Sequence, residues 1–289
     1  MTDSSLAHEN YNFVSEDYAK VREPVGLDIL LGCYFSEFKD LSTKKLADIG
    51  CGAGVYSYPL AKYFGEVCGI DRSSGQIQQA QNKEGIFQDV ISNPKFSVGN
   101  ATSLDIEDME FDAVLMSLML HHVREDGVSN TMLQKKAIEE ACRILKPSGT
   151  LIFGLCSKSQ VYDGAWYCSL VPSRIPDERI KLHPEIANVI EMCETMGFTF
   201  KGRYVQTDRV LQGKQYFNRL GPLDESWRNA DSLFSSLTET ELNSFVKRIE
   251  EMEKMGSLKA FIERHNELRA NIGQVTFLKL VKPAQTVDS

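Results

Sequence analysis

Short apolar runs alternate with segments of helical periodicity over residues 45–155. Each run is bounded by glycine or polar residues, as is typical of buried strands. Several of the intervening segments carry apolar residues three and four positions apart, which is typical of helices. The pattern predicts five strands, at Leu46–Ile49, Val67–Asp71, Lys95–Val98, Phe111–Ser117 and Thr150–Leu155.

The helices between these strands have recognisable boundaries. A helix is expected over Val55–Phe64, directly after a glycine loop, and another begins where Ser73 and Gln76 have the spacing of a capping box. Thr131–Leu145 carries one apolar helical face, and Pro147-Ser148-Gly149 is expected to stop that helix.

The pattern after residue 155 is less regular. Pro184–Met196 predicts a helix, and two further strands are expected at Phe198–Val205 and Gln274–Val281. The segment between these strands shows no sheet character. Its clearest element begins at a second capping box, Thr238 with Glu241. The apolar stripe that follows is most simply explained by packing, and joining two subunits into a homodimer is the alternative; it consists of Leu242, Phe245, Val246, Ile249 and Met252.

Alternation of strands and helices predicts an α/β fold with a doubly wound, seven-stranded, mostly parallel sheet and a helical cap insertion. Helices should cover both faces of the sheet, and ligands should bind at the carboxyl ends of its strands. The expected divisions are N-terminal lid helices over 1–40, a sheet core over 41–207 plus 273–283, and a cap over 208–272 that contributes to a substrate pocket.

Composition restricts the class of protein further. Forty acidic residues against 32 Lys and Arg leave a formal charge of −8, so nucleic acid is not expected as a partner. The seven cysteines show no C-x-x-C pair or metal-ligand spacing, which favours reduced thiols in the cytoplasm. We find no signal-like start and no apolar run long enough to span a membrane.

The most informative segment is the glycine loop Asp48-Ile49-Gly50-Cys51-Gly52-Ala53-Gly54. Glycines at alternate positions let a backbone pass close to a ligand, and Asp71, at the end of the next strand, can accept hydrogen bonds from ribose hydroxyls. A dinucleotide fingerprint would require glycine where Val55 stands. Asp48 would also repel a pyrophosphate and attract a cationic group. A nicotinamide dehydrogenase and a non-catalytic binding protein remain the alternatives.

The sequence at this point resembles the class I S-adenosylmethionine-dependent methyltransferases, which have a Rossmann-like fold. The glycine loop is similar to the family's first motif, and Gly69-Ile70-Asp71 to its ribose-binding strand end. Further matches follow in the family's order, and Leu120-His121-His122-Val123 resembles the small-molecule, ubiquinone-type (type 11) branch. These further segments are Gly99-Asn100-Ala101, Phe111-Asp112-Ala113-Val114 and Arg143-Ile144-Leu145-Lys146-Pro147-Ser148-Gly149.

The resemblance implies S-adenosylmethionine as cofactor and assigns roles to individual residues. The loop would lie along the methionine part, Asp71 would hold the ribose, and Asn100 with Ala101 would face the adenine. Ser117 would lie near the methionine amino group, and Tyr18 with Arg22 would belong to a lid. The full cofactor set expected is Tyr18, Arg22, Asp48, Gly50, Cys51, Gly52, Gly54, Asp71, Arg72, Gln76, Asn100, Ala101 and Ser117.

Methyl transfer mainly requires alignment in a closed pocket, and a hydroxyl acceptor benefits from a base. His121 or His122, just beyond the fourth strand, would supply it; the alternative is that one of the pair packs or caps the next segment. The acceptor is expected to be a small molecule, and no metal is expected. Candidate acceptor contacts outside the sheet core are Trp166, Tyr216, Trp227 and Arg228.

Overall fold

The computed structural model describes residues 22–83, 85, 89–125 and 127–284. The chain divides into two compact units. One contains Gly26–Ser157, Leu182–Gln206 and the residues from Val275 onward; the other contains residues 22–25, Lys158–Lys181 and Thr207–Gln274. We call them the sheet unit and the helical unit.

The sheet unit contains a seven-stranded sheet, as the sequence predicts, and its strand order is β3-β2-β1-β4-β5-β7-β6. Strands β1 to β5 pair in parallel, while β7 runs antiparallel to both of its neighbours. The strands are β1 (Lys45–Ile49), β2 (Glu66–Asp71), β3 (Lys95–Val98), β4 (Phe111–Ser117), β5 (Leu145–Leu155), β6 (Thr199–Gln206) and β7 (Val275–Val281).

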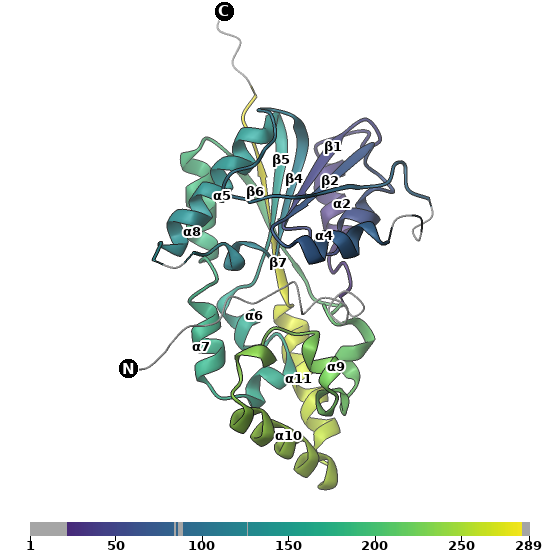
Figure 1. The fold of residues 1–289 in the computed structure, drawn as a ribbon, viewed down its shortest axis with the longest axis vertical. Coiled ribbons are helices and arrows are strands. Elements are labelled where there is room, and N and C mark those ends of the chain that lie inside the picture. The colour runs from purple at the N-terminus through teal and green to yellow at the C-terminus, as the bar shows by residue number, and fades with distance from the viewer. Residues whose placement is uncertain (1–21, 84, 86–88, 126, 285–289) are drawn as a thin grey trace, which may run out of the picture. The chain divides into compact units, whose positions relative to one another are not determined.

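Helices cover both faces of this sheet (Figure 1). They are α2 (Leu27–Phe35), α3 (Ser57–Leu60), α4 (Ser74–Gln81), the 3₁₀ turn η1 (Leu120–His122), α5 (Asn130–Ile144) and α8 (Ile186–Thr195). The start of α2 lies against β7, because a Cβ added to Gly26 would be 2.3 Å from the ring of Phe277. Helices α5 and α8 pack on the opposite face.

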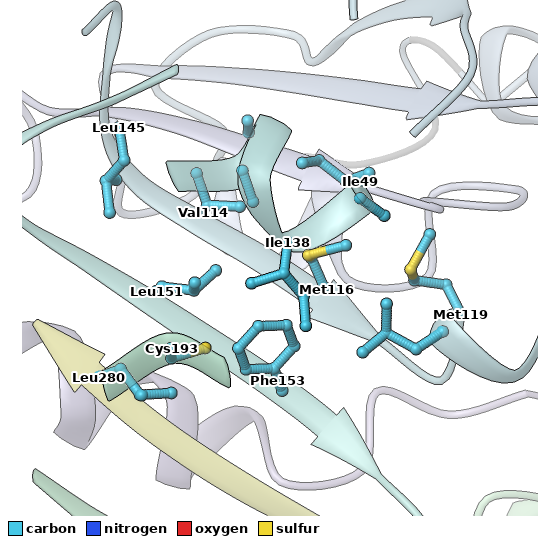
Figure 2. Close-up of a cluster of buried hydrophobic side chains, with 14 of the residues drawn as sticks. Ile49, Val114, Met116, Met119, Ile138, Leu145, Leu151, Phe153, Cys193 and Leu280 are labelled. Atoms are coloured by element: carbon cyan, nitrogen blue, oxygen red, sulfur yellow. The ribbon is translucent and has the colours of Figure 1, made fainter. Parts of the chain in front are cut away.

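The core between the sheet and the pair α5 and α8 is entirely apolar at its centre. Ile138 on α5 lies among side chains of the central strands, including Met116 and Phe153, all of them fully buried (Figure 2). Cys193 adds a buried thiol from α8. Met119 belongs to the same cluster at the carboxyl end of β4, so the core is continuous with the loop that follows that strand.

Apart from shifts of one or two residues, two boundaries and one helix cap in the sheet unit differ from those that the sequence predicts. Pro147-Ser148-Gly149 does not stop α5: the helix ends at Ile144, and β5 begins at Leu145 because Leu145 already pairs with Phe111 on β4. The helix expected over Val55–Phe64 is confined to the four residues of α3.

The third difference is at the start of α4, where only half of the predicted capping box forms. The side chain of Ser73 accepts a hydrogen bond from the N–H of Gln76, as expected. The N–H of Ser73, however, donates to Oδ1 of Asp71 at 2.9 Å instead of to the Gln76 side chain. A carboxylate two residues upstream competes with the amide for the same donor.

The helical unit has a separate apolar core. Its elements are α6 (Lys158–Asp163), η2 (Trp166–Leu170), α7 (Arg174–Ile180), η3 (Gly213–Phe217), η4 (Gly221–Leu223), α9 (Glu225–Asn229), η5 (Phe234–Ser236), α10 (Glu239–Lys254) and α11 (Leu258–Ile272). The capping box of Thr238 and Glu241 is complete. Phe245 and Ile249 of the α10 stripe are buried in this core, which supports the packing interpretation.

Helix α11 is not predicted from the sequence, because charged residues interrupt its apolar positions. None of the helices formed by the described residues combines the length and the apolar character needed to cross a bilayer.

Candidate functional site

The glycine loop lies at the carboxyl ends of β1 and β2. The N–H groups of Gly50 and Cys51 donate to the carbonyl oxygen of Ile70 at 2.7 and 3.1 Å, which fixes the loop to β2. Gly50, Gly52 and Gly54 all have left-handed φ angles, between 52° and 77°. A Cβ on Gly50 would be 2.5 Å from Cβ of Met119, so this position also excludes a side chain by contact.

Asp71 lies directly against the loop, as the sequence predicts. Its Oδ2 accepts the N–H of Gly52 at 2.8 Å, and its Oδ1 accepts the N–H of Ser73 at 2.9 Å. Burial raises the pKa of this carboxyl above its usual range, and the backbone N–H bonds partly oppose that shift. An ionised carboxylate has about four acceptor sites, so Asp71 keeps acceptor capacity for a ligand hydroxyl beside its backbone N–H bonds.

Two other buried polar side chains near the carboxyl ends of the strands have no hydrogen-bond partner among the described residues. Both amide atoms of Gln76 are buried without a partner, and its Oε1 lies 3.6 Å from where a Cβ on Gly52 would be. Oγ of Ser117, the last residue of β4, is the second case. Leaving a buried polar group unpaired costs about 1–3 kcal/mol, so both positions favour a polar ligand.

Asp48 lies beneath the loop with 2% of its surface exposed. Its Oδ2 accepts a 2.6 Å hydrogen bond from Oγ of Ser57. Burial raises the pKa of Asp48 to about 7, although the Ser57 hydroxyl lowers it. The carboxyl is therefore partly protonated near neutral pH, and its attraction for a cation is weaker than that of a fully ionised carboxylate.

Comparison with known proteins assigns this arrangement to a family. A methyltransferase domain profile matches residues 47–153, which include the glycine loop and strands β2 to β4. A ubiquinone biosynthesis O-methyltransferase from Pasteurella multocida is 32% identical over 194 residues, which are 62% of this chain and 75% of that protein. The chain belongs to the class I S-adenosylmethionine-dependent methyltransferases.

Other relatives of this methyltransferase match a smaller region. The human mitochondrial ubiquinone biosynthesis O-methyltransferase is 31% identical over 124 residues, which are 43% of this chain and 31% of the human protein. The fold agrees with a solved structure of a proposed methyltransferase from an antibiotic biosynthesis pathway of Anabaena variabilis. That structure has a TM-score of 0.68 and 17% identity, covering 90% of this chain and 98% of the other.

Family membership selects S-adenosylmethionine over a nicotinamide as the cofactor of this enzyme, and a small molecule as its methyl acceptor. The residues of the sheet unit fit that cofactor. The loop provides a side-chain-free surface, Asp71 an acceptor for hydroxyl groups, and Gln76 a buried amide that lacks a partner within the described part of the chain. No group of three or more His, Cys, Asp or Glu in the described part of this methyltransferase could hold a metal ion.

The remaining cofactor candidates occupy several positions. Asn100 follows Gly99, whose N–H donates to the carbonyl oxygen of Asp71, so Asn100 lies close to the ribose candidate. Its Oδ1 accepts the N–H and the hydroxyl of Thr102. Neighbouring Ala101 is half-buried, and Arg72 is exposed. Cys51 is 6% exposed, and burial raises its pKa well above the usual range, as suits a loop residue without a nucleophilic role.

His121 and His122 form the last two residues of η1 and are half-buried. Met119, two residues before His121, lies against Gly50, so η1 follows directly on the contact with the glycine loop. The structure also places His183, which the sequence does not single out, in a stack with His121. No local pattern indicates this contact, because His183 belongs to a distant segment.

One of the two lid candidates is among the described residues. Tyr18 lies outside the described residues. Arg22 belongs to the helical unit, where it and Arg179 lie near Asp231 and, against the effect of burial, hold the pKa of that carboxyl below its usual range. The hydroxyl of Tyr167 donates to Oδ2 of Asp231 at 2.5 Å, a polar cluster that the sequence does not reveal.

The four acceptor candidates all lie in the helical unit and help to build it. Trp166 and Tyr216 are fully buried, and the indole N–H of Trp166 donates to the carbonyl oxygen of Tyr216 at 2.9 Å. The indole of Trp227, which is 8% exposed, bonds to the carbonyl of Gln215, and Arg228 donates to that of Pro222. Contact of these side chains with an acceptor stays a prediction. The complete burial of Trp166 and Tyr216 does not favour such contact for those two residues.

Proposed function

We propose that this methyltransferase acts on a hydroxyl oxygen of its small-molecule acceptor and that an imidazole of the His121–His122 pair takes up the proton. The observation that carries the proposal is the contact of Met119 with Gly50, which joins the histidine turn to the glycine loop. Imidazole is the side chain best suited to accept a proton near neutral pH. The names of the relatives, which are O-methyltransferases, support oxygen as the acceptor atom.

The chain's own residues have separate tasks in this proposal. S-adenosylmethionine supplies an electrophilic methyl group on a positively charged sulfur. Asp71 binds the ribose hydroxyls, and the backbone of Gly50–Gly54 lies along the methionine part. Gln76 and Ser117 offer buried polar atoms to the same cofactor. The enzyme then has to orient the acceptor hydroxyl and accept its proton, since methyl transfer from a sulfonium needs no strong acid.

The test of the acceptor atom uses S-adenosylmethionine with an isotopically labelled methyl group. The purified enzyme is incubated with a phenol, a primary amine and a thiol of similar size, and the products are identified by mass spectrometry. We expect label on the phenol oxygen. Label on the amine or the thiol alone would contradict the proposal.

The test of the base uses His121→Ala and His122→Ala. Loss of a general base lowers kcat about 10²-fold or more, so at least one variant should lose turnover while its affinity for S-adenosylhomocysteine stays that of wild type. Full turnover in both variants would show that neither imidazole is needed as a base and that positioning of the acceptor is sufficient for methyl transfer.

Several finer expectations remain predictions. We expect a cytoplasmic enzyme, with acceptor specificity determined by the helical cap, including Trp227 and Arg228. The apolar stripe of α10 packs inside the helical unit, so it no longer supports the homodimer alternative.

A further inference from the structure

The ring of His121 lies against two other imidazoles. Its centroid is 3.8 Å from that of His122, with the planes inclined at 46°. The centroid of His183 is 4.2 Å away, and the two planes differ by only 13°. His183 lies just before α8, far from His121 along the chain but in the same compact unit. A nearly parallel stack at this distance covers one face of the His121 ring and restricts its plane.

A single buried amide links the two backbones that carry the stacked rings. Nε2 of Gln134, on α5, donates to the carbonyl oxygens of Leu120 and Leu182, both at 3.2 Å. Leu120 immediately precedes His121, and Leu182 immediately precedes His183. Gln134 is 4% exposed, so its donor depends on these carbonyls in a site without ready access to water. The amide therefore fixes the spacing of the two histidines.

The described residues around this cluster of imidazoles do not form a metal site. Within the described residues, no group of three or more His, Cys, Asp or Glu has the arrangement to hold a metal ion. Apolar packing would be served better by Leu or Phe than by a half-buried imidazole. The described contacts orient the ring: His121 is held against His183 within η1, which directly follows Met119, the residue that lies against the glycine loop.

We propose that His121 is the base and that His183 and Gln134 are positioning residues that fix the direction of its ring. This inference rests on the proposed function, in which a hydroxyl acceptor loses a proton to a base. The acceptor proton passes to an unprotonated nitrogen of His121 as the new oxygen–carbon bond forms and the sulfur–carbon bond breaks, with the electron pair remaining on sulfur. A misplacement of about 1 Å costs a catalytic group up to about 10²-fold in rate.

The kinetic test compares three variants of the full chain. His183→Leu removes the ring, His183→Phe keeps a ring face without nitrogens, and Gln134→Met keeps the length without the donor. We expect kcat for the phenol to fall about tenfold in His183→Leu and Gln134→Met, and to stay within about threefold of wild type in His183→Phe. The KM for the phenol and the Kd for S-adenosylhomocysteine should not change.

A matched control separates positioning from stability. Ile186 begins α8, three residues after His183, and packs on the apolar core of the sheet unit. Ile186→Ala should lower the Tm and leave kcat unchanged. If kcat falls equally in Ile186→Ala, or if His183→Phe is as slow as His183→Leu, a specific role of the stacked ring is excluded.

A second readout does not depend on turnover. In protein labelled with ¹⁵N-histidine, NMR should show a single tautomer of His121 and ring-proton shifts caused by the His183 stack. We expect the single tautomer and the ring-proton shifts to persist in His183→Phe. In His183→Leu we expect signals averaged over the orientations of the His121 ring. Unchanged His121 signals in His183→Leu would overturn the positioning role. Full turnover in His121→Ala would instead overturn the proposed base, so the two failures are distinguishable.

Discussion

At the scale of single residues, the most informative feature is the buried amide of Gln76. Gln76→Leu removes a buried polar group that has no hydrogen bond among the described residues. We expect the free energy of unfolding without cofactor to stay the same or rise by about 1 kcal/mol. Affinity for S-adenosylhomocysteine should fall about fivefold to tenfold, the effect of one lost hydrogen bond. Urea denaturation and calorimetry measure the two quantities.

A matched control is provided by Gln160, a buried amide that does have a partner. Its Nε2 donates to the carbonyl oxygen of Ile272 at 2.8 Å. Gln160→Leu should therefore destabilise the protein by about 1–2 kcal/mol. Equal destabilisation in Gln76→Leu, together with unchanged cofactor affinity, would show that Gln76 serves the fold and not the ligand.

The buried carboxyl of Asp48 should make stability depend on pH. Its folded pKa of about 7 lies above the ordinary value of 3.8, so the folded state binds more protons than the unfolded state between about pH 4 and pH 7. Stability contributed by the protonated carboxyl is therefore lost as pH rises through this window. In Asp48→Asn, which still accepts a bond from Ser57, that loss should be absent.

Denaturation of wild type and Asp48→Asn at a series of pH values measures the difference. The variant should become progressively more stable than wild type, by an amount on the order of 4 kcal/mol across the window. Parallel stability curves for the two proteins would contradict the raised pKa.

At the scale of elements, the two helix caps should differ in strength. Thr238 begins α10 with a complete capping box, whereas Ser73 begins α4 with half of one. Thr238→Ala should cost about 1–2 kcal/mol and Ser73→Ala about 0.5–1 kcal/mol. Hydrogen exchange of the first-turn amides of each helix measures both effects, with Thr238→Ser as the control. A larger loss at Ser73 would contradict the difference in capping.

Local pattern predicts the elements of the sheet well and their contacts poorly. Strands β3 and β4 have the predicted bounds, because each apolar run ends where the strand itself ends. The start of β5 was predicted late, since its first residue pairs with Phe111, beyond the reach of a local pattern. Helix α11 was missed because only Leu258, Ile262 and Arg269 of its residues are buried.

In the candidate site, too, the local pattern predicts the neighbouring elements and not the contacts between distant segments. The glycine loop and Asp71 were predicted because their meeting depends on two adjacent parallel strands, a topology that the βαβ pattern already implies. The stack of His121 with His183, and the amide of Gln134 that links them, depend on a segment inserted after β5. Such contacts arise from tertiary packing and leave no period in the sequence.

At the scale of the whole molecule, the helical unit is assembled from distant segments. Lys158–Lys181 joins Thr207–Gln274 in one compact unit. Buried amide bonds connect them: Gln160 donates to the carbonyl of Ile272, and Gln274 to that of Gly164. The sheet unit contains the glycine loop and Asp71, the proposed cofactor residues. The family profile accordingly matches residues 47–153 and none of the helical unit.

The central claim is that the sheet unit binds S-adenosylmethionine through the glycine loop and Asp71. Calorimetric titration of S-adenosylhomocysteine into wild type, Asp71→Ala and the control Asp112→Asn tests it most directly. Asp112 lies on β4 and pairs with Lys44 and Lys146, away from the loop. We predict a tenfold to hundredfold loss of affinity in Asp71→Ala, about 1.5–3 kcal/mol, and no loss in Asp112→Asn. Equal affinity of wild type and Asp71→Ala would contradict the claim.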